Sequence, residues 1–170
     1  YCGYAYDRDV TGVVRRQGQM CIRGGDAWEL GERMREETGL EPFFVTGHYG
    51  RASQLGFYLP GRPTVYCAAG AIGGSSRQYD HWLETDLSRA DVNARLLGRP
   101  AVILTGGGEH LQHAWSGAFG SIEVVGPLPG EPKANRTTLI GRDCVGFAPP
   151  GAARDTADTS PRAEPAPRSP

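Results

Sequence analysis

The chain has 170 residues, with 18 Lys plus Arg, 19 Asp plus Glu and a formal net charge of −1. Its charges are interleaved and form no basic stripe, so we expect no nucleic-acid partner. The length suits one domain with a sizeable core, and no apolar run is long enough to span a bilayer. No secretory signal peptide is recognisable, and the first residue is Tyr1 instead of Met. We therefore expect the chain to be a piece of a longer protein.

Three regions follow from composition. Residues 1–19 are rich in Gly, Tyr and Arg and are predicted to be a connecting segment that packs onto the domain. Residues 20–148 are predicted to form a soluble α/β domain. Residues 149–170 contain Pro, Ala, Arg and acidic residues but no large apolar side chain. Such a segment cannot bury enough surface to offset its ordering entropy, so it is predicted to be a disordered tail.

The first half of the domain alternates helix and strand. Asp26 is a suitable N-cap for a helix that Gly39 ends, with the apolar residues Ala27, Leu30 and Met34 at helical spacing. A short apolar run at 42–46 predicts a buried strand. A second helix at 51–59 ends before Pro60-Gly61, and a second strand is predicted at 64–67. The apolar residues of that second helix are Ala52, Leu55 and Leu59.

The second half adds further elements. A helix is predicted at 88–97, and the continuous apolar run at 101–105 predicts a strand covered on both faces. A core-facing stripe predicts a helix at 111–119. Strands at 121–125 and 137–147 are predicted to pair as a hairpin. Together these elements predict an α/β, three-layer domain with a mostly parallel sheet flanked by helices and a C-terminal β-hairpin.

Glycines follow three of the predicted strands, at 47–50, 70–74 and 106–108. In an open parallel sheet these turns lie at the carboxyl edge, where ligands usually bind, and a helix N-terminus there can hold a phosphate. Glycine is also common in such turns for geometric reasons alone, and neither GxGxxG nor a Walker A motif occurs. The phosphate-binding candidates are Gly47, Gly50, Gly106, Gly107 and Gly108.

The segment at 76–82, SRQYDHW, is dense in polar and aromatic side chains. Tyr and Trp supply rigid stacking faces, and Gln and Asp supply directional hydrogen bonds, as in sites for sugars or polar head groups. The alternative is a packed corner with Trp82 in the core and Asp80 capping a turn, and the residues alone favour this packed corner. The substrate-contact candidates are Gln78, Tyr79, Asp80, Trp82, His48 and Tyr49.

Cysteine and histidine give weak signals. None of the four cysteines forms CxxC or has metal-ligand spacing, and His110-x-x-His113 lacks a carboxylate partner, so no metal site is expected. Buried free thiols are the simpler expectation; if a disulfide forms, Cys67 and Cys144, which both fall in predicted strands, are the preferred pair. No nucleophile is paired with a base, so no catalytic residue is predicted.

Two segments resemble a known family. ASQLGFYLPGRPTVYC at 52–67 and SRQYDHW at 76–82 resemble the C-terminal region of bacterial family 39 glycosyltransferases. These enzymes are related to the dolichyl-phosphate-mannose protein mannosyltransferases and to the lipid A aminoarabinose transferase. The resemblance extends through DAWELGERM, GRPAVILT and TTLIGRDCVGF, and so covers most of 26–147.

The resemblance implies a polytopic membrane enzyme of the GT-C superfamily that takes a sugar from a polyprenyl-phosphate carrier outside the cytoplasm. Its catalytic carboxylate lies in an early loop that has no matching position here. The chain would then be an extracytoplasmic accessory domain that covers the active site of a cell-membrane protein, without a cofactor of its own. Its partners would be the transmembrane portion of the parent enzyme and the polyprenyl-phosphate sugar or acceptor.

Two other interpretations remain open. The first is a self-standing α/β module that binds a nucleotide or sugar phosphate at its glycine-rich strand ends. The second is a degenerate fragment without activity.

Overall fold

The computed structural model describes residues 12–72, 78–106, 113–127 and 136–147. They form an α/β fold with one five-stranded sheet. The helices are α1 (Gly12–Thr38), α2 (Tyr49–Tyr58) and α3 (Ala90–Leu96), and a short 3₁₀ helix, η1, spans Gln78–Asp80. The strands are β1 (Phe43–Thr46), β2 (Val65–Cys67), β3 (Ala101–Gly106), β4 (Phe119–Gly126) and β5 (Arg136–Cys144).

The sheet has the strand order β2-β1-β3-β5-β4. Strand β1 lies parallel to both β2 and β3, whereas β5 lies antiparallel to both β3 and β4. The sheet is therefore mixed, and the prediction of a mostly parallel sheet is wrong. A parallel neighbour needs a long crossover, whereas β4 and β5 follow each other closely and can pair only in antiparallel fashion. Their connection at 128–135 lies outside the described residues.

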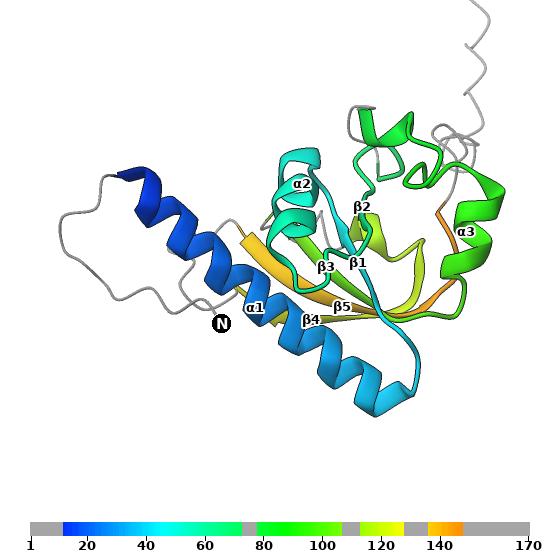
Figure 1. Ribbon diagram of the computed structural model, residues 1–170. Helices are drawn as coiled ribbons and strands as arrows, with labels where there is room; N and C mark the ends of the chain where they lie inside the picture. Colours follow the sequence, from blue (N-terminus) through cyan, green and yellow to red (C-terminus); the bar gives the residue numbers. More distant parts are fainter. Residues whose placement is uncertain (1–11, 73–77, 107–112, 128–135, 148–170) are drawn as a thin grey trace, which may run out of the picture.

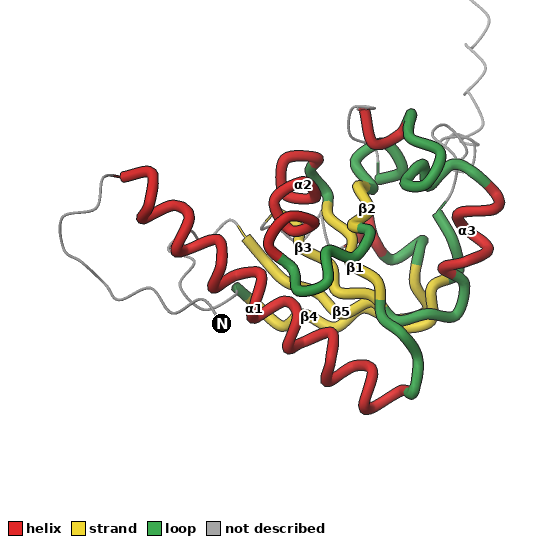
Figure 2. The backbone as a smooth tube through the Cα atoms, in the orientation of Figure 1, coloured by secondary structure: helices red, strands yellow, loops and turns green. Residues whose placement is uncertain are grey.

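Helices α1 and α2 cover one face of the sheet (Figure 1). The predicted apolar stripe of α1 is confirmed, because Ala27, Leu30 and Met34 are all buried. They share a core cluster with Ala52 and Leu55 of α2, and the strands contribute Phe44, Val65, Val102 and Ile140 to it. Figure 2 shows α1 running across the strands, with its N-terminal half projecting beyond the sheet.

The opposite face carries a second core cluster. Val92 and Leu96 of α3 pack there with Trp115, Phe119 and Phe147. From the sheet, Phe43, Val45, Ala101, Ile103 and Leu139 complete this cluster. The predicted helix at 111–119 differs at its end, because the chain is helical at 113–115 and Phe119 already begins β4.

The start of α1 also differs from the prediction. The helix begins at Gly12, so Asp26 lies in its interior and is not an N-cap. Gly24 and Gly25 directly precede Asp26, and the three residues together resemble the sequence pattern of a helix N-terminus. The residues before them, including Arg, Gln and Met, are good helix formers and continue the helix.

This interior position gives Asp26 an unusual electrostatic state. Among the described side chains, its Oδ2 is a buried oxygen without a hydrogen-bond partner. Burial, and secondarily the charge of Glu29, raises the pKa of the Asp26 carboxyl. A carboxyl whose pKa is higher in the folded than in the unfolded chain favours folding when protonated. That contribution is lost as pH rises through the folded pKa.

We therefore expect Asp26→Asn to increase the free energy of unfolding at pH 7, by at most about 1 kcal/mol because the side chain is only half-buried. The gain should shrink as pH falls through the raised folded pKa of Asp26 and should be absent below about 4, the ordinary pKa of Asp. Urea denaturation at pH 7 and below about pH 4 measures this difference in the free energy of unfolding. Asp91→Asn is the control of opposite sign, since a hydrogen bond from Arg89 lowers the pKa of Asp91. A gain that grows toward acid pH would contradict the sign.

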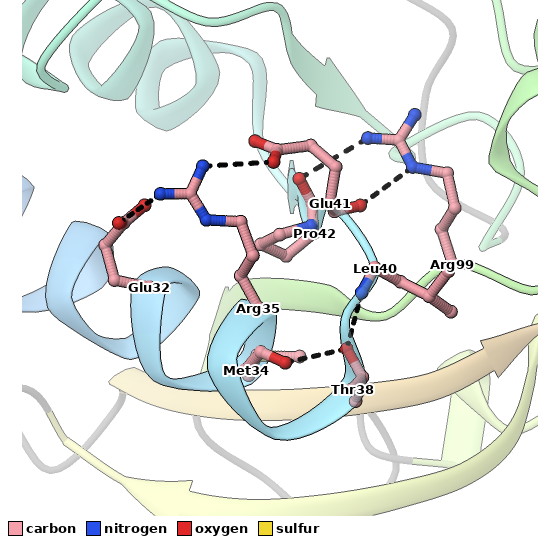
Figure 3. A network of polar contacts seen from close by, with 8 residues as sticks. All are labelled: Glu32, Met34, Arg35, Thr38, Leu40, Glu41, Pro42 and Arg99. Atoms are coloured by element: carbon pink, nitrogen blue, oxygen red, sulfur yellow. Dashed lines mark hydrogen bonds and ion pairs between the residues drawn. The ribbon is translucent and has the colours of Figure 1, made fainter.

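The amino ends of β1 and β3 are held together by Arg99 (Figure 3). Its Nε donates to the carbonyl oxygen of Glu41 at 2.9 Å, and its guanidinium lies 5.9 Å from the ring centre of Phe43. Arg35 of α1 pairs with Glu32 and with Glu41 in the same network. At this end of the sheet, the segments that connect the helices to the strands therefore bond to one another. The predicted ligand residues lie toward the other end.

Candidate functional site

The predicted site residues gather where the parallel strands β1, β2 and β3 end. Gly47 directly follows β1, η1 comes after β2, and Gly106 is the last residue of β3. Because parallel strands share their carboxyl edge, the structure brings these segments to one side of the sheet. Gly107 and Gly108 lie outside the described residues, as do the glycines at 73 and 74.

His48 caps the N-terminus of α2. Its Nδ1 accepts a hydrogen bond from the N–H of Gly50 at 3.1 Å, and its carbonyl accepts from the N–H groups of Arg51 and Ala52. Thr46 Oγ1 fixes this turn by donating to the His48 carbonyl at 2.8 Å. The N–H groups of Gly50 and Arg51, which an incoming phosphate could use, are therefore already bonded to His48, and that of Ala52 makes the first bond of the helix.

Of the two glycines of this turn, Gly50 has the closer neighbour. A Cβ on Gly50 would lie 3.3 Å from the His48 ring, and one on Gly47 would lie 3.4 Å from Ile72 and from Thr105. The geometric interpretation thus has support at Gly50, whereas a Cβ on Gly47 would make ordinary contacts, and the phosphate-binding role of both stays a prediction. The capping role of His48 was not anticipated, because Ser, Thr, Asp and Asn are the usual N-cap residues.

Tyr79 attaches η1 to α2. Its hydroxyl lies 3.1 Å from Ser53 Oγ, and its carbonyl accepts a 2.9 Å hydrogen bond from Thr85 Oγ1. The Tyr79 side chain is buried. Ser53 also donates to the carbonyl of Tyr49, at 3.2 Å, so one hydroxyl connects both segments.

Trp82 lies on the surface. Its side chain is 47% exposed, and its ring centre lies 5.0 Å from that of Tyr79. The predicted packed corner with Trp82 in the core is therefore wrong, and Tyr79 is the aromatic residue that enters the core. Tyr79 can bury its ring because Ser53 satisfies its hydroxyl. No sequence pattern indicates which of the two aromatic residues finds such a partner.

The exposed Tyr49 completes the group. Its ring stacks on His48 with centres 4.6 Å apart, and 45% of the side chain is exposed. We call His48, Tyr49, Tyr79 and Trp82 the aromatic row. Ser53 connects the segments that carry its two pairs of rings, through the Tyr49 carbonyl and the Tyr79 hydroxyl.

Gln78 and Asp80 flank the aromatic row. Gln78 is exposed, and Asp80 is half-buried. The Asp80 carboxylate packs on the chain at Gly70, where a Cβ would lie 3.1 Å from Asp80 Oδ2. Gly70 therefore leaves room for this carboxylate, a role that glycine spacing alone did not reveal.

The predicted disulfide between Cys67 and Cys144 does not form, because both are free, buried thiols. Cys67 lies in β2 and Cys144 in β5, with β1 and β3 between them. Three strand intervals amount to roughly 14 Å, far beyond the reach of a disulfide. The two thiols also belong to different core clusters. Burial is the main cause that raises the pKa of each thiol.

Thiol titration tests this state. In a Cys2→Ser/Cys21→Ser variant, we expect Cys67 and Cys144 to resist Ellman's reagent in the native protein, since buried protonated thiols react slowly. Both should react after denaturation without reductant. Finding no reactive thiol in the denatured variant would instead establish a disulfide.

Metal and membrane signals are both absent from the described parts of the chain. The residues of 25–72, 78–106, 113–127 and 137–147 contain no group of three or more His, Cys, Asp or Glu that could hold a metal ion. Of the predicted histidine pair, His113 is exposed and His110 lies outside the described residues. None of the described helices combines the length and apolar character needed to cross a bilayer.

Comparison with known proteins adds no identification. No protein-family model, curated protein or solved structure matches this chain. A functional assignment therefore depends on the chain's own residues.

Proposed function

We propose that this chain is the extracytoplasmic C-terminal domain of a polytopic membrane glycosyltransferase that transfers a sugar from a polyprenyl-phosphate carrier. The main support is the contact between the two segments that resemble family 39 enzymes. Residues 52–67 supply most of α2 and all of β2, and residues 76–82 include η1. The Ser53–Tyr79 hydrogen bond joins them beside the exposed Trp82.

The remaining motifs fit the same domain. DAWELGERM belongs to α1, GRPAVILT includes most of β3, and TTLIGRDCVGF includes most of β5. Helices packed on both faces of the sheet, and antiparallel pairing of β4 with β5, agree with the three-layer domain and terminal hairpin that the proposal includes.

The proposed role is accessory. The domain lies on the outer face of the cell membrane, contacts the transmembrane portion of the parent enzyme and covers its substrate. Catalysis belongs to the membrane portion, so the isolated chain transfers no sugar.

Two experiments test the proposal. The coding sequence upstream of Tyr1 should encode, in frame, several apolar segments of about 20 residues each. A start codon directly upstream of Tyr1 would refute a membrane parent. The purified chain should also show no turnover of a polyprenyl-phosphate sugar, whereas the parent enzyme should transfer it. Turnover by the chain alone would refute the accessory role.

The alternative is a self-standing module that binds a nucleotide or sugar phosphate at the glycine-rich strand ends. It is less favoured at the α2 turn, where His48 already accepts from Gly50, Arg51 and Ala52. Equilibrium dialysis against a nucleoside diphosphate separates the two, because the accessory domain predicts no retention.

A further inference from the structure

The two exposed rings of the aromatic row, Tyr49 and Trp82, stand on one connected scaffold. We infer that they form a stacking surface for the pyranose ring of a saccharide. This inference rests on the proposed function for the source of the sugar. It goes further by naming the contact surface and the class of ligand.

Trp82 is exposed yet held in place. Its carbonyl accepts hydrogen bonds from the N–H groups of Thr85 and Asp86, at 3.0 and 2.9 Å. One side of its indole lies against Tyr79, whose hydroxyl is fixed by Ser53. A ring that is already ordered loses little conformational entropy when a ligand stacks on it. Trp82 is therefore ordered before a ligand binds, unlike a side chain at the tip of a mobile loop.

Tyr49 is held in a similar way. It is the first residue of α2, its carbonyl accepts from Ser53, and its ring stacks on the His48 ring that caps the helix. Ser53 thus contacts the backbone of Tyr49 and also the hydroxyl of Tyr79, whose ring packs against Trp82. The two rings come from segments 33 positions apart (82 − 49), and both present nearly half of their surface to solvent.

The chemistry around the rings favours a neutral sugar. The face of an aromatic ring carries partial negative charge and attracts the C–H groups of a pyranose, while nearby amides and imidazoles can bond its hydroxyls. Gln78 and His81, which neighbour Tyr79 and Trp82 in sequence, are both exposed. Among residues 78–89, Asp80, Glu84 and Asp86 outnumber the one cation, Arg89, which pairs with Asp91. This excess of negative charge disfavours an anionic lipid surface as the direct ligand.

The test uses the full 170-residue chain and methyl β-D-glucopyranoside, whose equatorial hydroxyls leave C–H groups on both ring faces. Saturation-transfer NMR should show transfer to the sugar C–H protons. Titration should give at least tenfold weaker binding for Trp82→Ala and at least fivefold weaker binding for Tyr49→Ala. Trp82→Phe, which keeps an aromatic face, should lose less than Trp82→Ala.

Phe57→Ala is the matched control. Phe57 lies near the other end of α2 and is 63% exposed, so its loss removes a similar surface ring outside the aromatic row. Its binding should equal that of the unmodified chain. Thermal melts by circular dichroism confirm that each variant is folded, so that weaker binding reports the contact itself.

A second arm identifies the source of the sugar. Glucosyl phosphate on a short prenyl chain should bind more tightly than the methyl glycoside if the carrier supplies the ring. Equal or weaker binding assigns the ring to an acceptor glycan, and either result supports the stacking surface. The inference is overturned if no saturation transfer occurs or if Trp82→Ala binds normally. It is also overturned if Trp82 is needed only for binding phosphatidylglycerol vesicles. A failure here leaves the upstream reading frame, and hence the proposed function, to be judged separately.

Discussion

Replacing Trp115 by alanine is expected to lower the free energy of unfolding by about 3–5 kcal/mol, the usual cost of truncating a buried tryptophan. Trp115 is fully buried, and its ring packs edge-on against Phe147 with centres 6.5 Å apart. Its Nε1 lies 3.4 Å from Thr105 Oγ1, which is also buried. The substitution therefore opens a cavity and leaves the Thr105 hydroxyl without this partner.

Trp82→Ala is the matched control, because the same atoms are removed from a side chain that is 47% exposed. It should cost less than about 1 kcal/mol. Urea denaturation followed by circular dichroism compares both variants without relying on tryptophan fluorescence. Equal losses for the two variants would contradict the burial assigned to Trp115, and a large loss for Trp82→Ala would return Trp82 to the core.

Local sequence patterns predicted the central strand β3 and the buried face of α2 well. The continuous apolar run at 101–105 became β3, because a central strand is packed on both faces and needs no polar alternation. The apolar positions of α2 were also correct, with Ala52, Leu55 and Leu59 all buried. These features depend on a residue and its near neighbours in sequence. The spacing of apolar residues along the chain therefore reveals them.

Long-range pairing escaped prediction. The insertion of β5 between β3 and β4 depends on contacts between residues that are far apart in sequence, such as Val102 with Ile140. Neither strand carries a signal for its partner's direction. The same limit applies to the site, because the buried hydroxyl of Tyr79 is bonded by Ser53, which is distant in sequence. Sequence patterns thus identified the aromatic residues but not their arrangement.

Replacing Gly141 by alanine should lower the free energy of unfolding by about 1–3 kcal/mol, the cost of overpacking a core. A Cβ on Gly141 would lie 2.5 Å from Cδ1 of Phe119, well inside contact distance. The Phe119 ring cannot easily withdraw. It is buried, and it packs against Phe43 and Phe147 with ring centres about 6 Å away in each case.

Gly25→Ala provides the control of opposite sign. Gly25 lies inside α1, where an added Cβ would meet nothing within 4 Å, so alanine should stabilise the helix by up to about 1 kcal/mol. A double-mutant cycle with Phe119→Ala then identifies the cause of the Gly141 effect. If the clash with Phe119 is responsible, Gly141→Ala should cost far less once the ring is gone. An undiminished cost in that background would place the strain in the β5 backbone instead and contradict the packing described for Phe119.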